Sequence, residues 1–334
     1  MPTGTDDAAR RKRRKFRELL RRDTLTVMPG GFSPLFARMA EAIGFESFFV
    51  AGSQVSAFLY GVPDNGIIGL RDIVDHARHV AAQTEIPILL DTDTGFGNAV
   101  NVYFTVEECI RAGVAAIHIE DQEAPKKSGT VAGRRCIPID EAVGKFRAAA
   151  AARDALDPDF VICARCDALG AEGLTFEDAL ERCRAYATDG RADLIWLNSV
   201  ETREQARRVC AEVPAPVLVI WGGPAPAPTP EEYQRLGVRI ALYPTIAATF
   251  ALHAAWHGLN DFKARGAAAI EEFAGAIRAK PWGIADRNAL VRTDLVREIE
   301  EQFLPEAQRR DYAGTWGHKE AIYRDVTKPV EEKK

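Results

Sequence analysis

Eight short apolar runs, each followed by a stretch with helical periodicity, constrain the fold of this chain more than any other feature of its sequence. The runs cover residues 25–28, 47–51, 87–92, 115–120, 160–165, 194–198, 217–221 and 239–243. The helical patterns between them cover residues 34–43, 70–83, 105–112, 140–155, 175–188, 202–213, 230–236 and 245–258. Nearly continuous apolar strands that alternate with helices indicate a parallel sheet covered by helices on both faces.

The number of these strand–helix units points to a closed sheet, because eight units close a TIM-type barrel. We therefore predict an α/β protein with a (β/α)8 barrel over residues 24–265. A doubly wound open sheet is the alternative, and it usually begins with a Gly-rich dinucleotide or phosphate loop after the first strand. No such loop follows residues 25–28, so the barrel is favoured.

The two ends of the chain differ from the barrel pattern. Residues 1–23 are rich in Lys and Arg, and Phe16, Leu19 and Leu20 recur there at helical spacing. We interpret this segment as a helix that packs these three side chains inward, rather than as a nucleic-acid or membrane patch. Residues 266–325 predict extra C-terminal helices, which are too short for a core of their own and would pack on the barrel or on a neighbouring subunit. Residues 326–334 are expected to form a frayed tail.

The composition argues against several classes of protein. A net charge of −5 over 334 residues argues against nucleic acid as the main partner. No apolar run reaches the roughly 18 residues that a membrane-spanning helix needs, and no apolar stretch follows the basic N-terminus as in a secretory signal. Six cysteines in so long a chain do not make a disulfide framework. We expect a cytoplasmic protein that binds neither nucleic acid nor a membrane.

Acidic side chains gather at the predicted mouth of the barrel, where the strands end and barrel enzymes hold their active sites. Asp91 and Asp93 end the third run, Glu120 and Asp121 end the fourth, and Asp64 lies in the loop after the second. Carboxylates that converge at one place repel one another unless a cation lies between them. The mouth has too few His or Cys residues to favour Zn²⁺. Mg²⁺ is therefore the expected cation, with Mn²⁺ as a substitute.

A basic side chain and a long loop complete the predicted mouth. Arg165 ends the fifth run, where its guanidinium can bind a substrate carboxylate or phosphonate through two hydrogen bonds. The connection over residues 122–137 is long for a strand-to-helix loop and carries Lys126, Lys127, Ser128 and two glycines. Long polar loops with glycine often serve as lids at a barrel mouth, and an ordinary surface loop is the alternative.

Several motifs occur together in a fixed order along the chain. They are Met28-Pro29-Gly30, Gly61-Val62-Pro63-Asp64, Asp91-Thr92-Asp93-Thr94-Gly95-Phe96-Gly97-Asn98, Ile119-Glu120-Asp121-Gln122, Pro125-Lys126-Lys127 and Ala164-Arg165-Cys166-Asp167-Ala168. With them the chain resembles the isocitrate lyase / phosphoenolpyruvate mutase superfamily over about residues 15–305, in particular its members like 2-methylisocitrate lyase. The resemblance implies a Mg²⁺-dependent barrel that commonly assembles as a homotetramer, with helices swapped between subunits.

The resemblance also implies roles for the residues at the mouth. Asp91 matches a direct metal ligand, and Asp93 and Glu120 match ligands that act mainly through water. Asp64 matches a loop acid near the substrate, and Arg165 matches the arginine that holds the substrate carboxylate. The chemistry of the superfamily runs through an enolate of pyruvate, or of a related 2-oxo acid, that is chelated to Mg²⁺.

Other positions match the superfamily less well. The lyases carry Lys-Arg-Cys-Gly-His on the loop that corresponds to residues 122–137, where this chain has Ser128 in place of the acidic Cys. A Ser hydroxyl is a poor acid at neutral pH. They also carry a Glu after the sixth strand, where this chain has Asn198. The candidate catalytic residues are Asp64, Lys126, Ser128 and Arg165. The candidate substrate contacts are Gly52 and Ser53, which match a backbone cradle for the 2-oxo acid, together with Arg165 and Asn198.

Three functions remain open from the sequence. The first is a Mg²⁺-dependent lyase or decarboxylase that cleaves a C–C bond of a small 2-oxo or 2-hydroxy di- or tricarboxylate, like oxaloacetate or methylisocitrate. The second is a mutase or hydrolase of the P–C bond of phosphonopyruvate, which does not need the lid Cys. The third is a barrel that binds a 2-oxo acid without turning it over.

Overall fold

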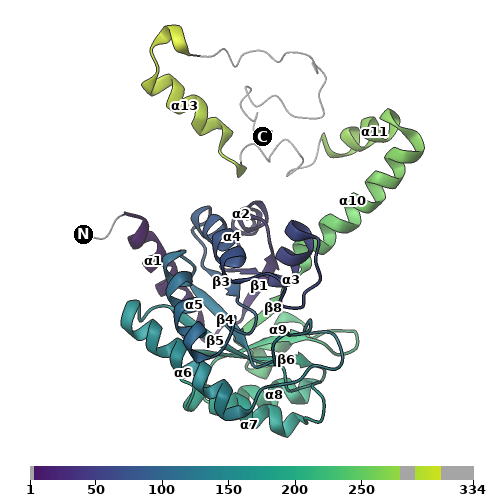
Figure 1. Ribbon diagram of the computed structural model, residues 1–334. Coiled ribbons are helices and arrows are strands. Elements are labelled where there is room, and N and C mark those ends of the chain that lie inside the picture. The colour runs from purple at the N-terminus through teal and green to yellow at the C-terminus, as the bar shows by residue number, and fades with distance from the viewer. Residues whose placement is uncertain (1–3, 279–289, 310–334) are drawn as a thin grey trace. The chain divides into compact units, whose positions relative to one another are not determined.

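Eight parallel strands form a closed barrel in chain order, in a computed structural model that describes residues 4–278 and 290–309 (Figure 1). The first strand pairs with both the second and the eighth, which closes the sheet. The predicted (β/α)8 barrel is thus confirmed, and the open sheet is excluded. The strands are β1 Thr26–Gly31, β2 Phe48–Val50, β3 Ile88–Asp91, β4 Ala116–Glu120, β5 Val161–Cys166, β6 Leu194–Val200, β7 Val217–Trp221 and β8 Ile240–Tyr243.

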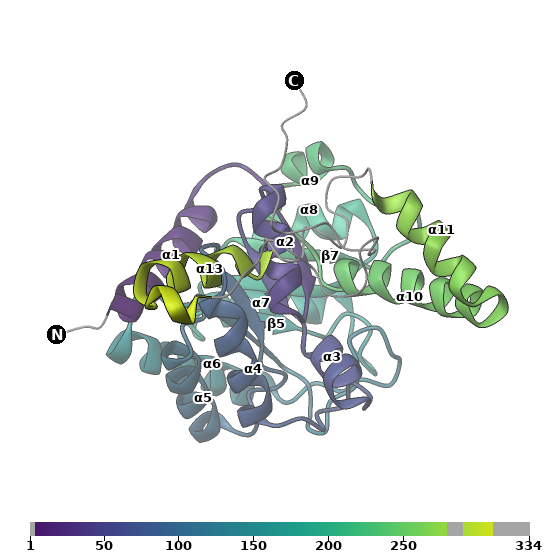
Figure 2. The same ribbon diagram turned by 90° about the horizontal axis from the view of Figure 1, so that it is seen from above.

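Helices lie between successive strands and surround the barrel, as Figure 2 shows from above. Each expected helix between the strands is present, but α5 begins at Ala99, well before the expected start at residue 105. The side chain of Asn98 accepts a hydrogen bond from the Val100 amide at 3.0 Å and so starts the helix early. The helices are α2 Pro34–Ile43, α4 Leu70–Ala82, α5 Ala99–Arg111, α6 Ile139–Leu156, α7 Phe176–Thr188, α8 Arg203–Glu212 and α9 Pro230–Leu236.

The segment after β2 contains two short helical turns that the apolar pattern did not predict. They are α3 Gly52–Val55 and the π-helix η1 Ser56–Tyr60. Gly61 ends η1 with a left-handed φ of 66°, a conformation that glycine adopts without a steric penalty. This segment brings Gly52 to the mouth of the barrel, beside Asp91.

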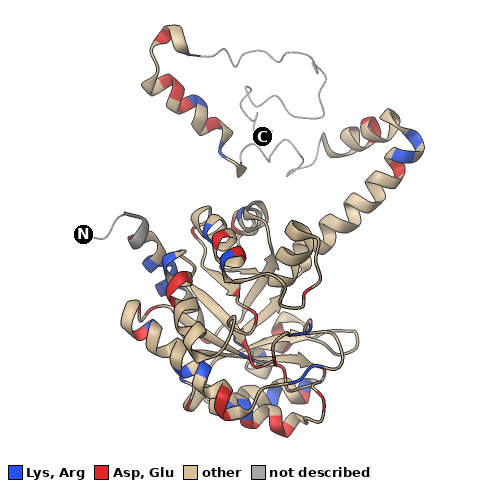
Figure 3. Ribbon diagram, viewed as in Figure 1, with Lys and Arg blue, Asp and Glu red and all other residues tan. Residues whose placement is uncertain are grey.

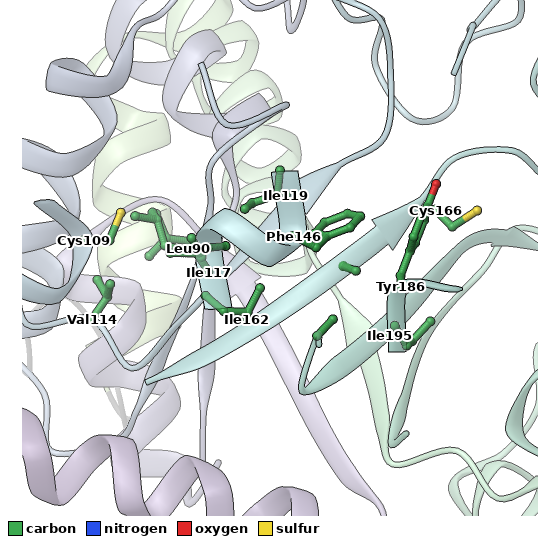
Figure 4. Close-up of a cluster of buried hydrophobic side chains, with 14 of the residues drawn as sticks. Leu90, Cys109, Val114, Ile117, Ile119, Phe146, Ile162, Cys166, Tyr186 and Ile195 are labelled. Atoms are coloured by element: carbon green, nitrogen blue, oxygen red, sulfur yellow. The ribbon is translucent and has the colours of Figure 1, made fainter. Parts of the chain in front are cut away.

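Alternation along each strand divides the buried side chains into two clusters. Outward-facing strand residues such as Leu90, Ile117 and Ile162 pack against the surrounding helices, where Phe146 of α6 and Tyr186 of α7 lie (Figure 4). Inward-facing residues fill the barrel and include Met28, Phe49, Leu89, Val161, Leu194, Trp196 and Leu218. The same alternation turns a polar residue near the end of a strand toward the mouth.

The basic N-terminal helix, α1 Gly4–Arg21, closes the base of the barrel, and Figure 3 shows its concentration of Lys and Arg. Phe16, Leu19 and Leu20 belong to the cluster inside the barrel, as expected. Two of its basic side chains are buried as well. Arg13 donates to the carbonyls of Val114 and Ile110 and pairs with Asp157 at 2.5 Å, and Lys12 donates to the Ala81 carbonyl at 2.7 Å.

The chain divides into two compact units, residues 1–248 and 249–334. The division falls inside α10 Ile246–Arg265, and the expected barrel boundary at residue 265 stays a prediction. The expected C-terminal helices are present as α11 Ala267–Arg278 and α13 Thr293–Phe303, followed by the 3-10 turn η3 Glu306–Gln308. Residues 310–334, which include the expected tail, lie outside the described residues.

Two findings bear on the environment of the chain. Among the described residues, no helix is both long enough and apolar enough to cross a membrane. All six cysteines lie in the described part of the chain, and all are free thiols.

Candidate active site

The polar residues at the mouth come from neighbouring strands in matched register. Asp91 pairs with His118 across β3 and β4, and Glu120 pairs with Arg165 across β4 and β5. Cα partners on adjacent parallel strands point their side chains to the same face of the sheet. These four side chains therefore lie together, and all four are buried.

Asp91 is held by two backbone amides and one imidazole. Its carboxylate accepts hydrogen bonds from the Gly52 amide at 2.9 Å and the Asp93 amide at 3.0 Å. The Nε2 atom of His118 lies 3.1 Å from Oδ1. Burial alone would raise the pKa of Asp91, but His118 and the nearby Lys126 outweigh it and hold that pKa far below its usual value. Asp91 is therefore an anion with a fixed orientation.

Position 52 leaves little room for a side chain. A Cβ atom there would lie 3.0 Å from the Asp91 carboxyl, tighter than most real Cβ contacts. Glycine thus allows the backbone amide to approach the carboxylate. Ser53 follows in α3 and is half-buried.

The ammonium group of Lys126 lies among three carboxyl groups from different loops and strands. Its Nζ is 2.6 Å from Asp64, 2.8 Å from Asp93 and 3.7 Å from Glu120. Burial would lower the pKa of Lys126, but the carboxylates raise it above its ordinary value. Burial and the charge of Asp91 raise the pKa of Asp93 to about 6, against the opposing pull of Lys126.

Glu120 is a fully buried carboxyl group of the cluster. Its Oε1 lies 2.9 Å from Arg165 NH1, and its Oε2 accepts from the Gln122 amide at 2.9 Å. Burial raises the pKa of Glu120 to about 8, although the charges of Arg165 and Lys126 act in the opposite direction. Glu120 therefore exchanges a proton near neutral pH, and a cation bound beside it would expel that proton.

Arg165 is held between two carboxylates and an aromatic ring. Its Nε and NH2 each lie 3.0 Å from an oxygen of Asp167, while NH1 faces Glu120. The guanidinium carbon stacks 4.5 Å from the centre of the Trp196 ring. Asn198 donates to the same Asp167 at 2.7 Å, so Asp167 fixes both groups. A guanidinium in this setting is always charged and is pre-oriented for a planar anion.

The loop over residues 122–137, which we call the lid, covers Arg165. Gln122 and Cys136 pair in a short antiparallel bridge at its base. The carbonyl of Gly129, near its tip, accepts from the Asn198 amide at 3.0 Å. A Cβ atom at position 129 would collide with Arg165 and come within 2.9 Å of the Asn198 amide. The tip of the lid therefore lies directly against Arg165 and Asn198.

A cavity of about 560 Å³ lies at the outer side of the acidic cluster. Asp93 and Lys126 form its polar wall, and Ile67, Phe96 and Phe104 supply apolar surface. The cavity brings solvent to the cluster while the lid covers Arg165.

Most of the sequence-predicted residues lie in this one site. Asp64, Asp93 and Glu120 meet at Lys126, while Gly52 contacts Asp91 and Asn198 shares Asp167 with Arg165. Ser128 is half-buried beside Gly129 in the lid. In the described part of the chain, the side chains of Ser128 and Ser53 make no hydrogen bond to the cluster.

Three residues of the site escaped the sequence reasoning. His118 precedes Glu120 by two positions, and this spacing on a strand places both on one face. The same spacing relates Asp167 to Arg165 and could have identified it. Arg134 lies far along the lid and carries no comparable signal.

The oxygen-rich donor set suits a hard divalent cation. Asp91, His118 and Glu120 can each offer a ligand atom, and these atoms lie within 4.8 Å of one another. Asp93, which we expected to act on the cation mainly through water, pairs with Lys126. Five carboxyl groups (Asp64, Asp91, Asp93, Glu120 and Asp167) surround three cationic side chains (Lys126, Arg134 and Arg165), so the full set carries an excess of negative charge. Mg²⁺ prefers carboxylate oxygens, and the imidazole also suits Mn²⁺.

A closed barrel with a buried, acid-rich mouth is typical of (β/α)8-barrel enzymes, and this mouth holds a possible site for a divalent cation. The chain belongs to the phosphoenolpyruvate phosphomutase family, which it matches over residues 16–263. The expected superfamily is thereby confirmed.

Named relatives include lyases of small carboxylates. The chain is 34% identical over 294 residues to 2,3-dimethylmalate lyase of Eubacterium barkeri, covering 86% of this chain and 97% of the relative. It is 36% identical over 252 residues to 2-methylisocitrate lyase of Aeropyrum pernix, covering 75% and 79%.

Solved structures with the same fold come from two reaction types. Oxaloacetate acetylhydrolase bound to 3,3-difluorooxalacetate has a TM-score of 0.78 and 32% identity, covering 88% of this chain and 97% of that one. Phosphonopyruvate hydrolase bound to oxalate and Mg²⁺ has a TM-score of 0.77 and 31% identity, covering 88% and 99%.

Proposed function

We propose that this chain is a Mg²⁺-dependent lyase or decarboxylase that cleaves a C–C bond of a small 2-oxo or 2-hydroxy di- or tricarboxylate. The observation that carries the proposal is the pairing of the Asp91–Glu120 donor set with Arg165 in one buried site. Mn²⁺ is expected to replace Mg²⁺. The lyases among the relatives, and the oxaloacetate enzyme among the solved structures, support this choice.

Each side chain has a distinct part in this proposal. Asp91 and Glu120 hold the cation, and Asp93 acts on it through water. When bound, the cation stabilises the negative charge that develops on the enolate oxygen of the product. Arg165 binds the substrate carboxylate through two hydrogen bonds, for which it exchanges one of its present carboxylate partners.

Lys126 and Asp64 are the groups placed to move a proton. The Nζ of Lys126 carries a proton at neutral pH and lies 2.6 Å from the Asp64 carboxyl. Gly52 and Ser53 present the backbone that cradles the 2-oxo end of the substrate. Asn198 and Ser128 face the part of the substrate that leaves.

The identity of these last residues favours a reaction that needs little acid assistance. Ser128 is a weaker acid than a Cys would be, and Asn198 cannot donate a carboxyl proton. Cleavage of an oxaloacetate-like acid, which gives a stabilised enolate directly, fits this pair better than cleavage that needs a strong acid on the lid.

Cleavage or transfer of the P–C bond of phosphonopyruvate is the second candidate. The observations that favour it are the family match and the similarity to phosphonopyruvate hydrolase. A phosphonate group would take the place of the substrate carboxylate at Arg165.

The test is pyruvate or 2-oxo acid release from a panel of substrates, with and without Mg²⁺. The panel holds oxaloacetate, isocitrate, 2-methylisocitrate, 2,3-dimethylmalate and phosphonopyruvate. We expect metal-dependent release from a carboxylate, lost in Asp91→Asn and retained in Asp75→Asn, because Asp75 is an exposed acid on α4. Undiminished turnover by Asp91→Asn would refute the proposal. Release from phosphonopyruvate alone would establish the second candidate, and calorimetric binding of oxalate without turnover of any panel member would establish a binding protein.

We also propose a homotetramer in which C-terminal helices are exchanged between subunits. Phe250, Trp256 and Leu259 of α10 are each more than two-thirds exposed, and large exposed apolar side chains grouped on one helix often contact a partner. Light scattering after gel filtration is expected to give the mass of four chains for the wild-type protein and of fewer for Trp256→Asp. A monomeric wild-type protein would contradict this arrangement.

The proposed location is the cytoplasm. Six free thiols with no disulfide are typical of a reducing compartment. We expect the protein in the soluble cytoplasmic fraction on cell fractionation, and recovery in an oxidising compartment would contradict the assignment.

A further inference from the structure

Arg134 is a buried charge in the lid that the proposed chemistry does not use. Only 4% of its surface is exposed, although it lies in a connecting loop. Buried arginines are rare unless they are paired and hydrogen-bonded. The neighbouring Arg135 has the opposite character, because its side chain is exposed and pairs with the exposed Glu172.

The contacts of Arg134 join the lid to the ends of two barrel strands. Its NH2 donates to the Leu169 carbonyl at 2.9 Å, and its NH1 lies 3.3 Å from Asp167. Both nitrogens also reach the Ser199 hydroxyl at 3.3 Å. NH1 donates in addition to the carbonyl of Gly129 within the lid itself. One guanidinium thus ties the tip of the lid to the loop after β5 and to the end of β6.

The surroundings of Arg134 are shaped to receive it. Gly170 lies where a Cβ atom would come within 2.5 Å of NH2, and its φ of +89° favours glycine. Ser199 has a φ of 61°, which is uncommon for a residue other than glycine. This backbone places the Ser199 hydroxyl against both Arg134 and the Gly129 carbonyl, at 3.3 and 3.4 Å.

We propose that Arg134 is a positioning residue that latches the closed lid and couples its closure to the substrate-binding Arg165. The coupling passes through Asp167, since a single oxygen of this residue faces Arg134, Arg165 and Asn198. Opening of the lid withdraws Arg134 from Asp167 and the Gly129 carbonyl from Asn198. Arg165 and Asn198 are then held by an Asp167 that has lost one cationic partner.

The proposal rests on the proposed function only for its kinetic test. Its structural test is hydrogen–deuterium exchange of the lid amides over residues 127–133, measured with Mg²⁺ and oxalate and also without them. The variants are Arg134→Ala, Arg134→Lys and the matched control Arg135→Ala. Peptides from β4 and β5 report whether each variant keeps the barrel intact.

We expect Arg134→Ala to raise lid exchange about tenfold or more, since it removes several charge-assisted hydrogen bonds. Arg134→Lys should lie between the wild type and Arg134→Ala, because an ammonium cannot make all these contacts at once. Arg135→Ala should match the wild type. For a panel substrate that the enzyme turns over, kcat/KM should fall in each variant by the same factor by which lid exchange rises. A merely structural role of Arg134 would not link kcat/KM to the rate of lid exchange.

Two results would overturn the latch. One is lid exchange in Arg134→Ala within about twofold of that in Arg135→Ala. The other is a loss of activity in Arg134→Ala with unchanged lid exchange. Faster exchange throughout β4 and β5 of Arg134→Ala would show a general loss of structure. The test then rests on Arg134→Lys, whose lid exchange must exceed that of Arg135→Ala if the latch exists. If no panel substrate is turned over, the exchange measurements still decide on the latch, so the two proposals fail separately.

Discussion

Binding of the divalent cation should be linked to a proton on Glu120. Burial raises the pKa of this carboxyl group to about 8, and only the ionised form can bind the cation. The apparent dissociation constant is then the intrinsic constant multiplied by one plus ten to the power of pKa minus pH. Between pH 8 and pH 6 this factor grows from about 2 to about 100, so affinity should fall about fiftyfold. The affinity must fall as the pH is lowered, because acid favours the protonated form of Glu120, which cannot bind the cation.

The assay is a titration with Mn²⁺ as the probe, followed by electron paramagnetic resonance between pH 6 and pH 8. Glu120→Gln cannot titrate at this position, so its affinity should be lower at pH 8 but should depend much less on pH. Any pH dependence of the Mn²⁺ affinity that remains near pH 6 in this variant is expected from Asp93, whose pKa is raised to about 6. The matched control is Glu123→Gln, an exposed carboxyl three positions further along, which should keep the wild-type profile.

A wild-type affinity for Mn²⁺ that changes less than about threefold over this pH range would contradict proton-linked binding at Glu120. An unchanged pH dependence of the affinity in Glu120→Gln would contradict it equally. Either result would mean that the cation binds without displacing a proton from Glu120, and hence that the ligand set differs from the one proposed.

Three further perturbations test other parts of the structure. Arg13→Ala removes a guanidinium buried at the base of the barrel and should lower the free energy of unfolding by about 3–5 kcal/mol in urea denaturation. Substitution of the exposed Arg14 by Ala should leave the free energy of unfolding nearly unchanged, and equal effects of the two substitutions would contradict the prediction. Gly129→Ala places a methyl group against Arg165, so the lid cannot close and kcat/KM should fall at least about tenfold. Wild-type kinetics in this variant would show that Gly129 does not lie against Arg165 when the lid closes. Ser128→Cys supplies a stronger acid and should raise turnover of 2-methylisocitrate or 2,3-dimethylmalate about tenfold or more, and no gain would mean that the lid residue is not the acid.

The periodic part of the fold could be predicted from the sequence, and the exceptions have local causes. All eight strands match the apolar runs because a parallel barrel buries both faces of each strand. The first turns of α5 were missed because residues 99–104 are rich in β-branched and aromatic side chains, and only the cap at Asn98 reveals the start. The short turns α3 and η1 after β2 could not be predicted, because their residues show no regular spacing of apolar side chains.

The site could be predicted where its residues lie at the ends of strands. Asp91, Glu120 and Arg165 follow from position alone once the barrel is accepted. The ion pairs of Lys126 and Arg134 could not be predicted, because a long loop has no period that fixes where its side chains point. The two buried basic residues of α1 were missed for a related reason, since carbonyl partners on other helices leave no mark in the local sequence.

The helix at the base of the barrel has a consequence for how the chain folds during synthesis. Arg13 of α1 binds residues near 110, 114 and 157, and Arg17 reaches Asp159, Phe160 and Asp193. None of these partners exists when α1 leaves the ribosome, because chains emerge N-terminus first. This helix must therefore wait for partners as far along the chain as Asp193. It is synthesised before those partners and docks late, so its apolar side chains need protection from aggregation during that interval.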